Sequence, residues 1–320
     1  MKIAVFEKFG GPEVLELVDS PKPDLADDEI LIKVHATTVT AAECQMRRGR
    51  PLWGRVILGV LRPRRRRRTL GMELAGEVMS VGKNVRRFKP GDKVFGFTGF
   101  GPGANAEYTC MAESGSVEIM PDNVGFDDAA ALVDGASTAL YFLRDKAHIR
   151  PGQQVLINGA SGSIGTYAVQ LARYFGAEVT AVCSARNADL VRSLGADHVI
   201  DYAVDDFAQR FGHYDVIFDT IGASSFARCH GALKKDGCYL PTTGLANWPR
   251  MWWTALRRGR RVITGMSVDK RALLGFVRDL AEKGELVAVI DRRYHFVQLP
   301  EAHHYVEQRH KRGNVTISVG

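Results

Sequence analysis

The sequence predicts an α/β protein in which a doubly wound parallel sheet domain is joined to a β-rich domain. Two observations support this fold class. An apolar strand at residues 155–158 leads into a glycine turn and a helix that begins near Ser163, and strands and helices then alternate as far as residue 265. Residues 1–123 read instead as strands separated by turn signals such as Pro90-Gly91-Asp92.

The element boundaries follow from periodicity and turn residues. In the β-rich domain, strands are expected at residues 2–6, 29–35, 73–81 and 93–97. In the sheet domain, strands are expected at 155–158, 178–183, 198–201, 215–219, 238–241 and 262–265, with helices at 127–146, 188–194 and 224–233. The predicted domains are 1–123, 124–266, and a segment 267–320 that returns to the first domain because its helices break the alternation.

The composition is that of an ordinary globular enzyme, with 45% hydrophobic and 25% charged residues. The net charge is +7, and six of the positive charges come from Arg62 and residues 64–68. Because the excess charge is local, a solvated basic loop is favoured over a nucleic-acid surface. No apolar run is long enough to span a membrane, and Lys2 and Glu7 place charge too early for a signal peptide. Five scattered cysteines predict reduced thiols in a cytoplasmic protein.

The glycine turn predicts dinucleotide binding. Ala160-x-Gly162-x-x-Gly165 is the dinucleotide fingerprint with alanine at its first glycine position. Small residues there let backbone N–H groups and a helix N-terminus approach a pyrophosphate. The residues expected to hold the cofactor in this stretch are Ala160, Ser161, Gly162, Ser163, Ile164 and Gly165. The alternative is that small residues merely fit a crowded strand–helix turn.

Several motifs, in this order, resemble the medium-chain dehydrogenase/reductase superfamily. They are Leu70-Gly-Met-Glu-Leu-Ala-Gly-Glu-Val78, Val81-Gly-x-x-Val-x-x-Phe-x-x-Gly-Asp-x-Val94, Ala106-Glu-Tyr108, the glycine turn and Leu194-Gly-Ala-Asp197. The chain is most similar to the zinc-free quinone oxidoreductase branch. This resemblance implies a GroES-like substrate domain, a Rossmann NADP-binding domain, an active site in the cleft between them, and a homodimer joined through the Rossmann sheets.

The residues after the second strand of the sheet domain favour NADPH over NADH. An acidic residue would hold the ribose of NAD there, but the chain has Ser184 and Arg186 and no carboxylate before Asp189. A carboxylate would repel the 2′-phosphate of NADP, whereas an arginine can pair with it. We therefore expect Arg186 and Ser184 to hold that phosphate. The resemblance adds Tyr202 beside the phosphate and Thr138 beside the nicotinamide; an exposed loop arginine, a strand-end aromatic and a buried helix threonine are the alternatives.

No metal is expected. In zinc-dependent relatives, three positions supply ligands, and here these positions read Thr40-Ala-Ala-Glu43, Gly71-Met72-Glu73 and Asp134-Gly-Ala-Ser-Thr138. Only one carboxylate remains in a ligand position, whereas a catalytic zinc site needs three protein ligands. Thr40, Glu43 and Asp134 are instead candidates for polar residues of the cleft, with structural roles left equally open.

Without a Lewis acid, a conjugated acceptor is favoured over a simple ketone because it spreads the developing negative charge itself. The sequence thus predicts an NADPH-dependent reductase that transfers hydride to a quinone or an α,β-unsaturated carbonyl, with no proton donor chosen. The alternatives are an NADP-dependent alcohol dehydrogenase-like enzyme, and a dinucleotide-binding scaffold that engages RNA or another polyanion through the arginine run 62–68. The predicted partners are a small-molecule substrate and a second copy of the chain, without a membrane or nucleic acid.

Two further expectations concern packing. The tryptophans of residues 244–253 are expected in the core or in a dimer interface, with lining of the substrate slot as the alternative. His303, His304 and His310 are expected at the surface of the last helix.

Overall fold

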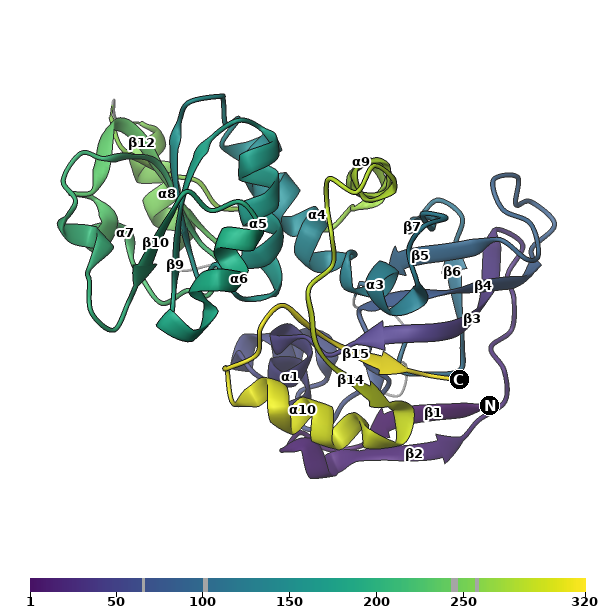
Figure 1. The fold of residues 1–320 in the computed structure, drawn as a ribbon. Coiled ribbons are helices and arrows are strands. Elements are labelled where there is room, and N and C mark those ends of the chain that lie inside the picture. The colour runs from purple at the N-terminus through teal and green to yellow at the C-terminus, as the bar shows by residue number, and fades with distance from the viewer. Residues whose placement is uncertain (65–66, 100–102, 243–246, 257–258) are drawn as a thin grey trace. The chain divides into compact units, whose positions relative to one another are not determined.

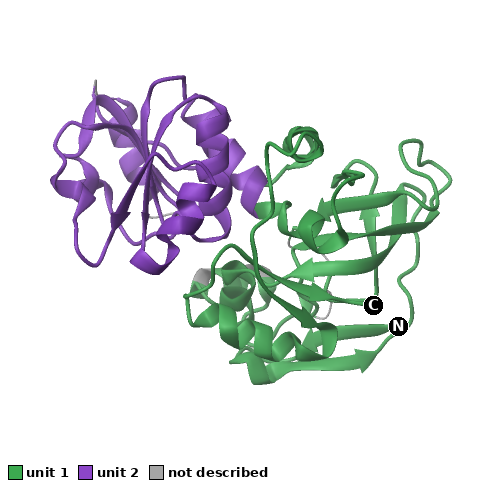
Figure 2. Cartoon of the chain, viewed as in Figure 1, with its two compact units in different colours: residues 1–134, 268–320 green, residues 135–267 purple. Residues whose placement is uncertain are grey.

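The computed structural model describes residues 1–64, 67–99, 103–242, 247–256 and 259–320. The chain divides into two compact units, which are Met1–Asp134 with Val268–Gly320 (unit 1) and Gly135–Ser267 (unit 2), as Figure 2 shows. The first boundary lies later than the predicted one at residue 123. The reason is that helix α3 (Phe126–Ala131) packs against strands β3 (Glu29–Thr38), β4 (Glu73–Val81) and β15 (Asn314–Ser318) of unit 1.

Unit 2 is built on a six-stranded parallel sheet (Figure 1). In order across the sheet, its strands are β10 (His198–Asp201), β9 (Glu178–Cys183), β8 (Gln154–Asn158), β11 (Tyr214–Asp219), β12 (Leu233–Pro241) and β13 (Arg261–Val262). The order reverses between β8 and β11, and doubly wound sheets bind ligands at such a point, at the carboxyl ends of the strands. The predicted doubly wound parallel sheet is therefore confirmed.

Two helices of unit 2 precede its first strand, and the others lie between its strands. They are α4 (Asp134–Leu140, whose first residue belongs to unit 1), a π-helix (Tyr141–Lys146), α5 (Ser163–Tyr174), α6 (Ala188–Ser193), α7 (Phe226–Cys229) and α8 (Trp248–Ala255). In β8, Val155, Leu156 and Ile157 are fully buried, as expected of a central strand that is covered on both faces.

Unit 1 contains a seven-stranded sheet and a separate antiparallel pair, β1 (Lys2–Phe6) with β2 (Leu15–Asp19). The larger sheet runs β14 (Ile290–His295), β15, β3, β4, β5 (Lys93–Phe97) and β7 (Ser116–Ile119), and β6 (Tyr108–Ala112) pairs with β3. The pairs are antiparallel except β14 with β15. The other helices of this unit are α1 (Ala41–Arg47), α2 (Arg55–Leu58), α9 (Arg271–Glu282) and α10 (Leu299–Glu307).

The C-terminal segment completes the core of unit 1. Leu299 of α10 and Val315 and Ile317 of β15 belong to the same apolar cluster as Ile32 and Val34 of β3. None of the helices in the described ranges has both the length and the apolar character needed to cross a membrane.

The helix predicted at 127–146 is interrupted. It divides into α3, α4 and the π-helix, with a turn at Leu132 and Val133. The backbone N–H of Asp134 donates to Oε1 of Glu73 at 2.5 Å, so a side chain from β4 caps the start of α4.

The helix predicted at 224–233 is also wrong in extent, because only α7 is helical. The Asp219 carboxylate accepts hydrogen bonds from the N–H groups of Ala223 (3.3 Å) and Ser224 (2.9 Å), which holds these residues in a turn. At the other end, Leu233 already belongs to β12.

Two packing expectations need correction. Trp248, Trp252 and Trp253 of α8 are exposed, so they do not lie in the core of unit 2, whereas their place in a dimer interface stays a prediction. Residues 244–246 of the same predicted loop are outside the described residues. His303 is fully buried on α10, where its Nδ1 lies 3.4 Å from Sγ of Cys44. Burial lowers the pKa of His303 to about 3.

Candidate functional site

The glycine turn links β8 to α5 in unit 2. Gly159 has a φ of 81°, which favours glycine, and its N–H and that of Ala160 both donate to the Val182 carbonyl of β9 at 3.1 Å. Gly162 is the N-cap of α5, and the N–H of Thr166 closes the first helical hydrogen bond to the Gly162 carbonyl at 2.9 Å. The amides of residues 163–165 therefore lie at the helix N-terminus, where the peptide dipoles favour an anion.

The two later glycines of the turn have different surroundings. A Cβ added to Gly165 would lie 2.1 Å from the carbonyl oxygen of Gly159, so backbone packing alone requires a glycine there. A Cβ added to Gly162 would meet only that same oxygen, at 3.3 Å. A side chain at Gly162 thus needs only a small adjustment of the chain itself, so backbone packing does not require a glycine there.

The three residues predicted around the 2′-phosphate follow the carboxyl ends of the neighbouring strands β9 and β10. Ser184 directly follows β9 and precedes a short 3-10 helix that contains the exposed Arg186. Tyr202 directly follows β10, and its N–H donates to the Cys183 carbonyl at 3.3 Å. This arrangement offers a hydroxyl, a guanidinium and an aromatic ring along one edge of the sheet.

The carboxylates near this edge are engaged elsewhere. Asp189 is exposed and pairs with Arg192 at 3.1 Å. Asp201, the last residue of β10, accepts the N–H of Ala203 at 3.0 Å. No acidic residue directly follows β9, where one would hold the ribose of NAD.

Two residues that the sequence reasoning missed organise the same edge. Asn187 is buried, and its Nδ2 donates to Oγ of Ser161 at 3.0 Å, which ties the glycine turn to the loop after β9. Asp219 ends β11 and is fully buried; its carboxylate accepts hydrogen bonds from Nδ2 of Asn158 (3.0 Å) and the hydroxyl of Tyr239 (2.8 Å). The signal for Asp219 was an acidic residue that closes an otherwise apolar strand.

Thr138 lies on α4, near the start of α5. A Cβ added to Gly135 would lie 2.9 Å from Oγ of Ser163 and 2.8 Å from the ring of Tyr167, so α4 packs directly on the first turn of α5. Thr138 is half-buried one turn further along α4. Its predicted contact with a nicotinamide remains a proposal.

In unit 1, Thr40 and Glu43 form a capping box at the start of α1. The Glu43 carboxylate accepts the N–H of Thr40 at 3.0 Å and the N–H of Gly71 at 2.7 Å, and it is fully buried. Burial raises the pKa of Glu43 to about 7. These contacts give both residues a structural role.

Asp134 takes part in a buried polar cluster with Glu73, Thr38 and Lys270. Glu73 accepts hydrogen bonds from the hydroxyl of Thr38 and from the N–H of Asp134, and Oδ1 of Asp134 pairs with Nζ of Lys270 at 2.8 Å. Lys270 is itself buried, and its Nζ lies 4.8 Å from the centre of the Phe97 ring. Burial first, and the nearby Asp134 charge second, raise the pKa of Glu73 to about 8.

Within the described ranges, no three His, Cys, Asp or Glu side chains are arranged as a set of metal ligands. Met72, at the position of the histidine in the zinc-dependent triplet, is buried. The absence of zinc remains a prediction.

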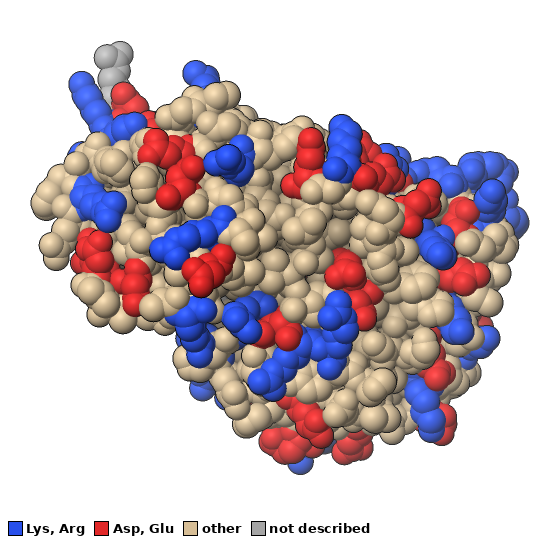
Figure 3. All heavy atoms as spheres, in the orientation of Figure 1, with Lys and Arg blue, Asp and Glu red and all other residues tan. Residues whose placement is uncertain are grey.

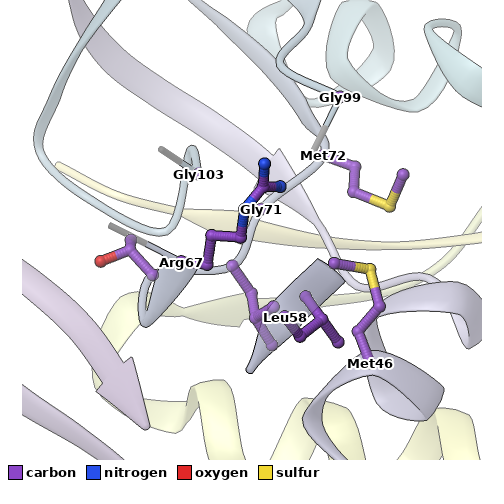
Figure 4. Close-up of a pocket in the computed structure, with 9 residues that line it drawn as sticks. Met46, Leu58, Arg67, Gly71, Met72, Gly99 and Gly103 are labelled. Carbon is purple, nitrogen blue, oxygen red and sulfur yellow. The ribbon is translucent and has the colours of Figure 1, made fainter. Parts of the chain in front are cut away.

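A small apolar pocket lies beside this region of unit 1. Its lining residues are Met46, Leu58, Arg67, Thr69, Leu70, Gly71, Met72, Gly99 and Gly103. Figure 4 shows two thioethers and an aliphatic side chain around the pocket, from Met46, Met72 and Leu58. Its volume of about 10 Å³ is close to the space of one water molecule, so the side chains nearly fill it.

Known proteins match the chain along most of its length. Residues 26–122 match the alcohol dehydrogenase GroES-like domain, and residues 194–317 match a zinc-binding dehydrogenase model. A human mitochondrial NAD(P)H oxidoreductase is 30% identical, over 98% of this chain and 88% of the human protein. The chloroplast envelope quinone oxidoreductase homolog of Arabidopsis thaliana is 30% identical, over 96% of this chain and 95% of the plant protein.

A solved structure gives the same result. The quinone oxidoreductase from Coxiella burnetii matches with a TM-score of 0.90 and 29% identity, over 100% of this chain and 99% of that one. The chain therefore belongs to the medium-chain dehydrogenase/reductase superfamily. Unit 1 is its GroES-like domain and unit 2 its Rossmann domain. Within the superfamily the chain is a quinone oxidoreductase-like protein, which confirms the predicted resemblance.

Proposed function

We propose that the chain is an NADPH-dependent reductase that transfers hydride to a quinone or an α,β-unsaturated carbonyl without a metal. One observation carries this proposal. At the carboxyl edge of the unit 2 sheet, the turn with an open position at Gly162 is followed, at the next strand end, by Arg186 instead of a carboxylate. The names of the human NAD(P)H oxidoreductase and the plant quinone oxidoreductase homolog support the same class of reaction.

Residues of unit 2 would hold the cofactor, which supplies the hydride when bound. The amides of residues 163–165 at the N-terminus of α5 would bind the pyrophosphate, and Ala160 and Gly162 would leave room for it. Ser161 would be oriented by its hydrogen bond with Asn187.

A second group of residues would select NADPH. Arg186 would pair with the 2′-phosphate, Ser184 would donate a hydroxyl hydrogen bond and Tyr202 would pack beside the same group. Thr138 would border the nicotinamide, because α4 starts against the first turn of α5.

The polar residues of unit 1 that were candidates for the cleft are already hydrogen-bonded or paired, which favours a conjugated acceptor. Glu43 is buried and hydrogen-bonded, and Asp134 is paired with Lys270, so we assign neither as the proton donor. Thr40 is engaged as the N-cap of α1. A quinone or enone delocalises the negative charge that hydride transfer creates, so it needs less stabilisation of that charge by protein side chains. Water can then protonate the product.

NADPH consumption tests the proposal directly. We expect turnover with quinones, enones or alkenals, and none with simple ketones or, in the oxidative direction, simple alcohols. A strong chelator should leave the rate unchanged. Oxidation of simple alcohols that is lost on chelation would favour the alcohol dehydrogenase-like alternative.

The proposal includes a homodimer. Strand β13 lies at the edge of the unit 2 sheet, and Trp252 of the preceding helix α8 is exposed, so this part of unit 2 presents apolar surface beside a strand edge. Light scattering should give twice the chain mass, and Trp252→Glu should shift the protein towards monomer. An unchanged mass for this variant would place any interface elsewhere.

We also retain a cytoplasmic location in this proposal. All five cysteines are free thiols, which suits a reducing compartment. Fractionation of the source cells, followed by immunodetection of the protein, would test this location.

A further inference from the structure

A stretch of unit 1, residues 50–64, combines apolar side chains with unpaired arginines on the surface. Between Glu43 and Glu73 the sequence contains ten arginines and no acidic residue. In the same stretch, Leu52 and Val56 are 71% and 67% exposed. Isolated exposed apolar residues are common, but a contiguous group flanked by one sign of charge marks an interaction surface.

The most exposed part of this stretch is a tip held by backbone hydrogen bonds. The N–H of Arg64 donates to the Leu58 carbonyl at 2.7 Å, which closes the chain over residues 58–64. Leu58 is buried at the base of this loop, where it also lines the small apolar pocket. At the tip, Val60 and Leu61 are 64% and 88% exposed. The loop therefore presents two aliphatic side chains from a fixed base.

The backbone of residues 58–64, the tip loop, is fixed by a turn at Gly59. Gly59 has a φ of 133°, and its N–H donates to the Arg55 carbonyl at 2.7 Å. A Cβ at Gly59 would lie 1.9 Å from the Arg62 carbonyl oxygen. Only glycine fits this position, so the exposure of the tip follows from a defined turn.

Three exposed arginines of residues 50–64 have no acidic partner among the described residues. Arg50, Arg62 and Arg64 are exposed, and no carboxylate of the described residues lies within ion-pair distance of them. The guanidinium of Arg64 instead donates a hydrogen bond to an uncharged group, from Nη2 to the Val56 carbonyl oxygen at 3.2 Å. On the face shown in Figure 3, by contrast, basic and acidic side chains are interspersed.

We propose that residues 50–64 bind peripherally to the surface of an anionic phospholipid bilayer. Val60 and Leu61 enter the boundary between headgroups and acyl chains, while Arg62, Arg64 and Arg50 contact lipid phosphates. The sequence predicts no membrane partner, on the ground that it has no spanning run; peripheral binding needs no such run, and the test below decides between the two. The inference does not depend on the proposed reaction, because its test uses no cofactor or substrate.

The aliphatic residues and the arginines favour an anionic bilayer over two other partners, a single-stranded nucleic acid and a second copy of the chain. Single-stranded nucleic acids are bound by aromatic side chains that stack on bases, and valine and leucine cannot stack. A second copy of the chain would place the same arginines opposite one another in a two-fold interface, which is repulsive without acidic partners. A bilayer offers both an apolar layer and negative charge.

Vesicle sedimentation tests the proposal with the full chain. One set of vesicles contains phosphatidylcholine alone, and another contains phosphatidylcholine and phosphatidylglycerol at three to one. We expect binding to the anionic vesicles only, weakened by salt. Arg62→Gln with Arg64→Gln should weaken binding about thirtyfold, and Val60→Ser with Leu61→Ser should weaken it at least about tenfold.

Matched controls separate this effect from a general change of charge or polarity. Arg271→Gln with Lys283→Gln removes two exposed charges, from the first residue of α9 and from its C-cap. Val297→Ser removes an exposed apolar side chain elsewhere in unit 1. Both controls should bind like the parent, and thermal melts should confirm that every variant is folded. No binding of the parent to anionic vesicles would overturn the proposal. So would a loss of binding in the arginine variant with none in the Val60/Leu61 variant, or binding to RNA but not to vesicles, because each indicates a purely electrostatic polyanion surface.

Discussion

The carboxylate of Glu73 and the backbone N–H of Asp134 form a hydrogen bond of 2.5 Å that joins the start of β4 to the start of α4. The same carboxylate accepts the hydroxyl of Thr38, at the end of β3. A single buried acidic group thus connects two strands and a helix. Removing such a group without a polar replacement leaves its partners unsatisfied, which costs about 1–3 kcal/mol for each.

This carboxyl group predicts a pH dependence of stability. Its pKa is raised from 4.5 to about 8 in the folded chain. Between these two values the folded state binds more protons than the unfolded state, so the free energy of unfolding falls as the pH rises through this window. We expect Glu73→Gln to flatten the fall by about 1–3 kcal/mol between pH 5 and pH 8, measured by denaturant titration.

Glu77, on the same strand, provides the control for this experiment. It is only half-buried, and Glu77→Gln should keep the pH dependence of the parent. Glu43, with a pKa of about 7, acts in the same direction and accounts for the slope that remains in Glu73→Gln. Identical slopes for the parent and Glu73→Gln would contradict the assignment.

Arg186 predicts the choice between the two nicotinamide cofactors. NADPH should bind at least about tenfold more tightly than NADH, a difference of about 1.4 kcal/mol. Arg186→Ala should remove most of this difference, because the charge that meets the 2′-phosphate is lost. Arg192→Ala, which removes an exposed arginine of α6 that pairs with Asp189, should leave it unchanged. Equal dissociation constants for the two cofactors in the parent protein would refute the preference.

Substitutions of Gly162 and Gly165 should have different effects, the first on cofactor binding and the second on stability. Gly162→Val should weaken NADPH binding by tenfold or more with a small change in Tm, because the side chain fills the space of the pyrophosphate rather than protein. Gly165→Val should cost about 1–3 kcal/mol of stability, because its Cβ meets the Gly159 carbonyl oxygen at 2.1 Å. A thermal melt and a cofactor titration for each variant check both. If Gly162→Val binds NADPH like the parent, the turn is not the dinucleotide site.

The metal content is open to a direct measurement. Although residues 194–317 match a zinc-binding dehydrogenase model, the ligand positions hold Thr40 and Met72. Protein purified without chelator should contain well under one zinc per chain, by atomic emission. Stoichiometric zinc in that sample would show that ligands other than these positions bind it.

Local patterns were sufficient for much of unit 2. A short apolar strand, a turn of small residues and a periodic helix are encoded within about twenty consecutive residues, and β8, β9 and β10 end at the residues expected. The same locality allowed Ser184, Arg186 and Tyr202 to be placed at neighbouring strand ends, since parallel strands align their carboxyl ends.

The buried polar cluster could not be found in this way. Thr38, Glu73, Asp134 and Lys270 are distant in the sequence and meet only when β3, β4, α4 and the start of α9 pack. Each of these residues alone is an ordinary polar residue, and its partners are fixed by tertiary structure. The sequence could not decide between core and interface for the α8 tryptophans for a related reason, because a hydrophobic pattern shows that a surface is apolar without showing what covers it.

The position of β15 between β14 and β3 has a consequence for the order in which the chain acquires its structure. Unit 2 is a continuous stretch, Gly135–Ser267, so all of its strands are synthesised before β14 and β15. Unit 1 is divided around it and cannot complete its sheet until residues 314–318 have been made. Until then, the edge of β3 that later pairs with β15 is open to other strands. Synthesis therefore completes the Rossmann domain first, and the earlier-made half of the GroES-like domain waits for the last strand.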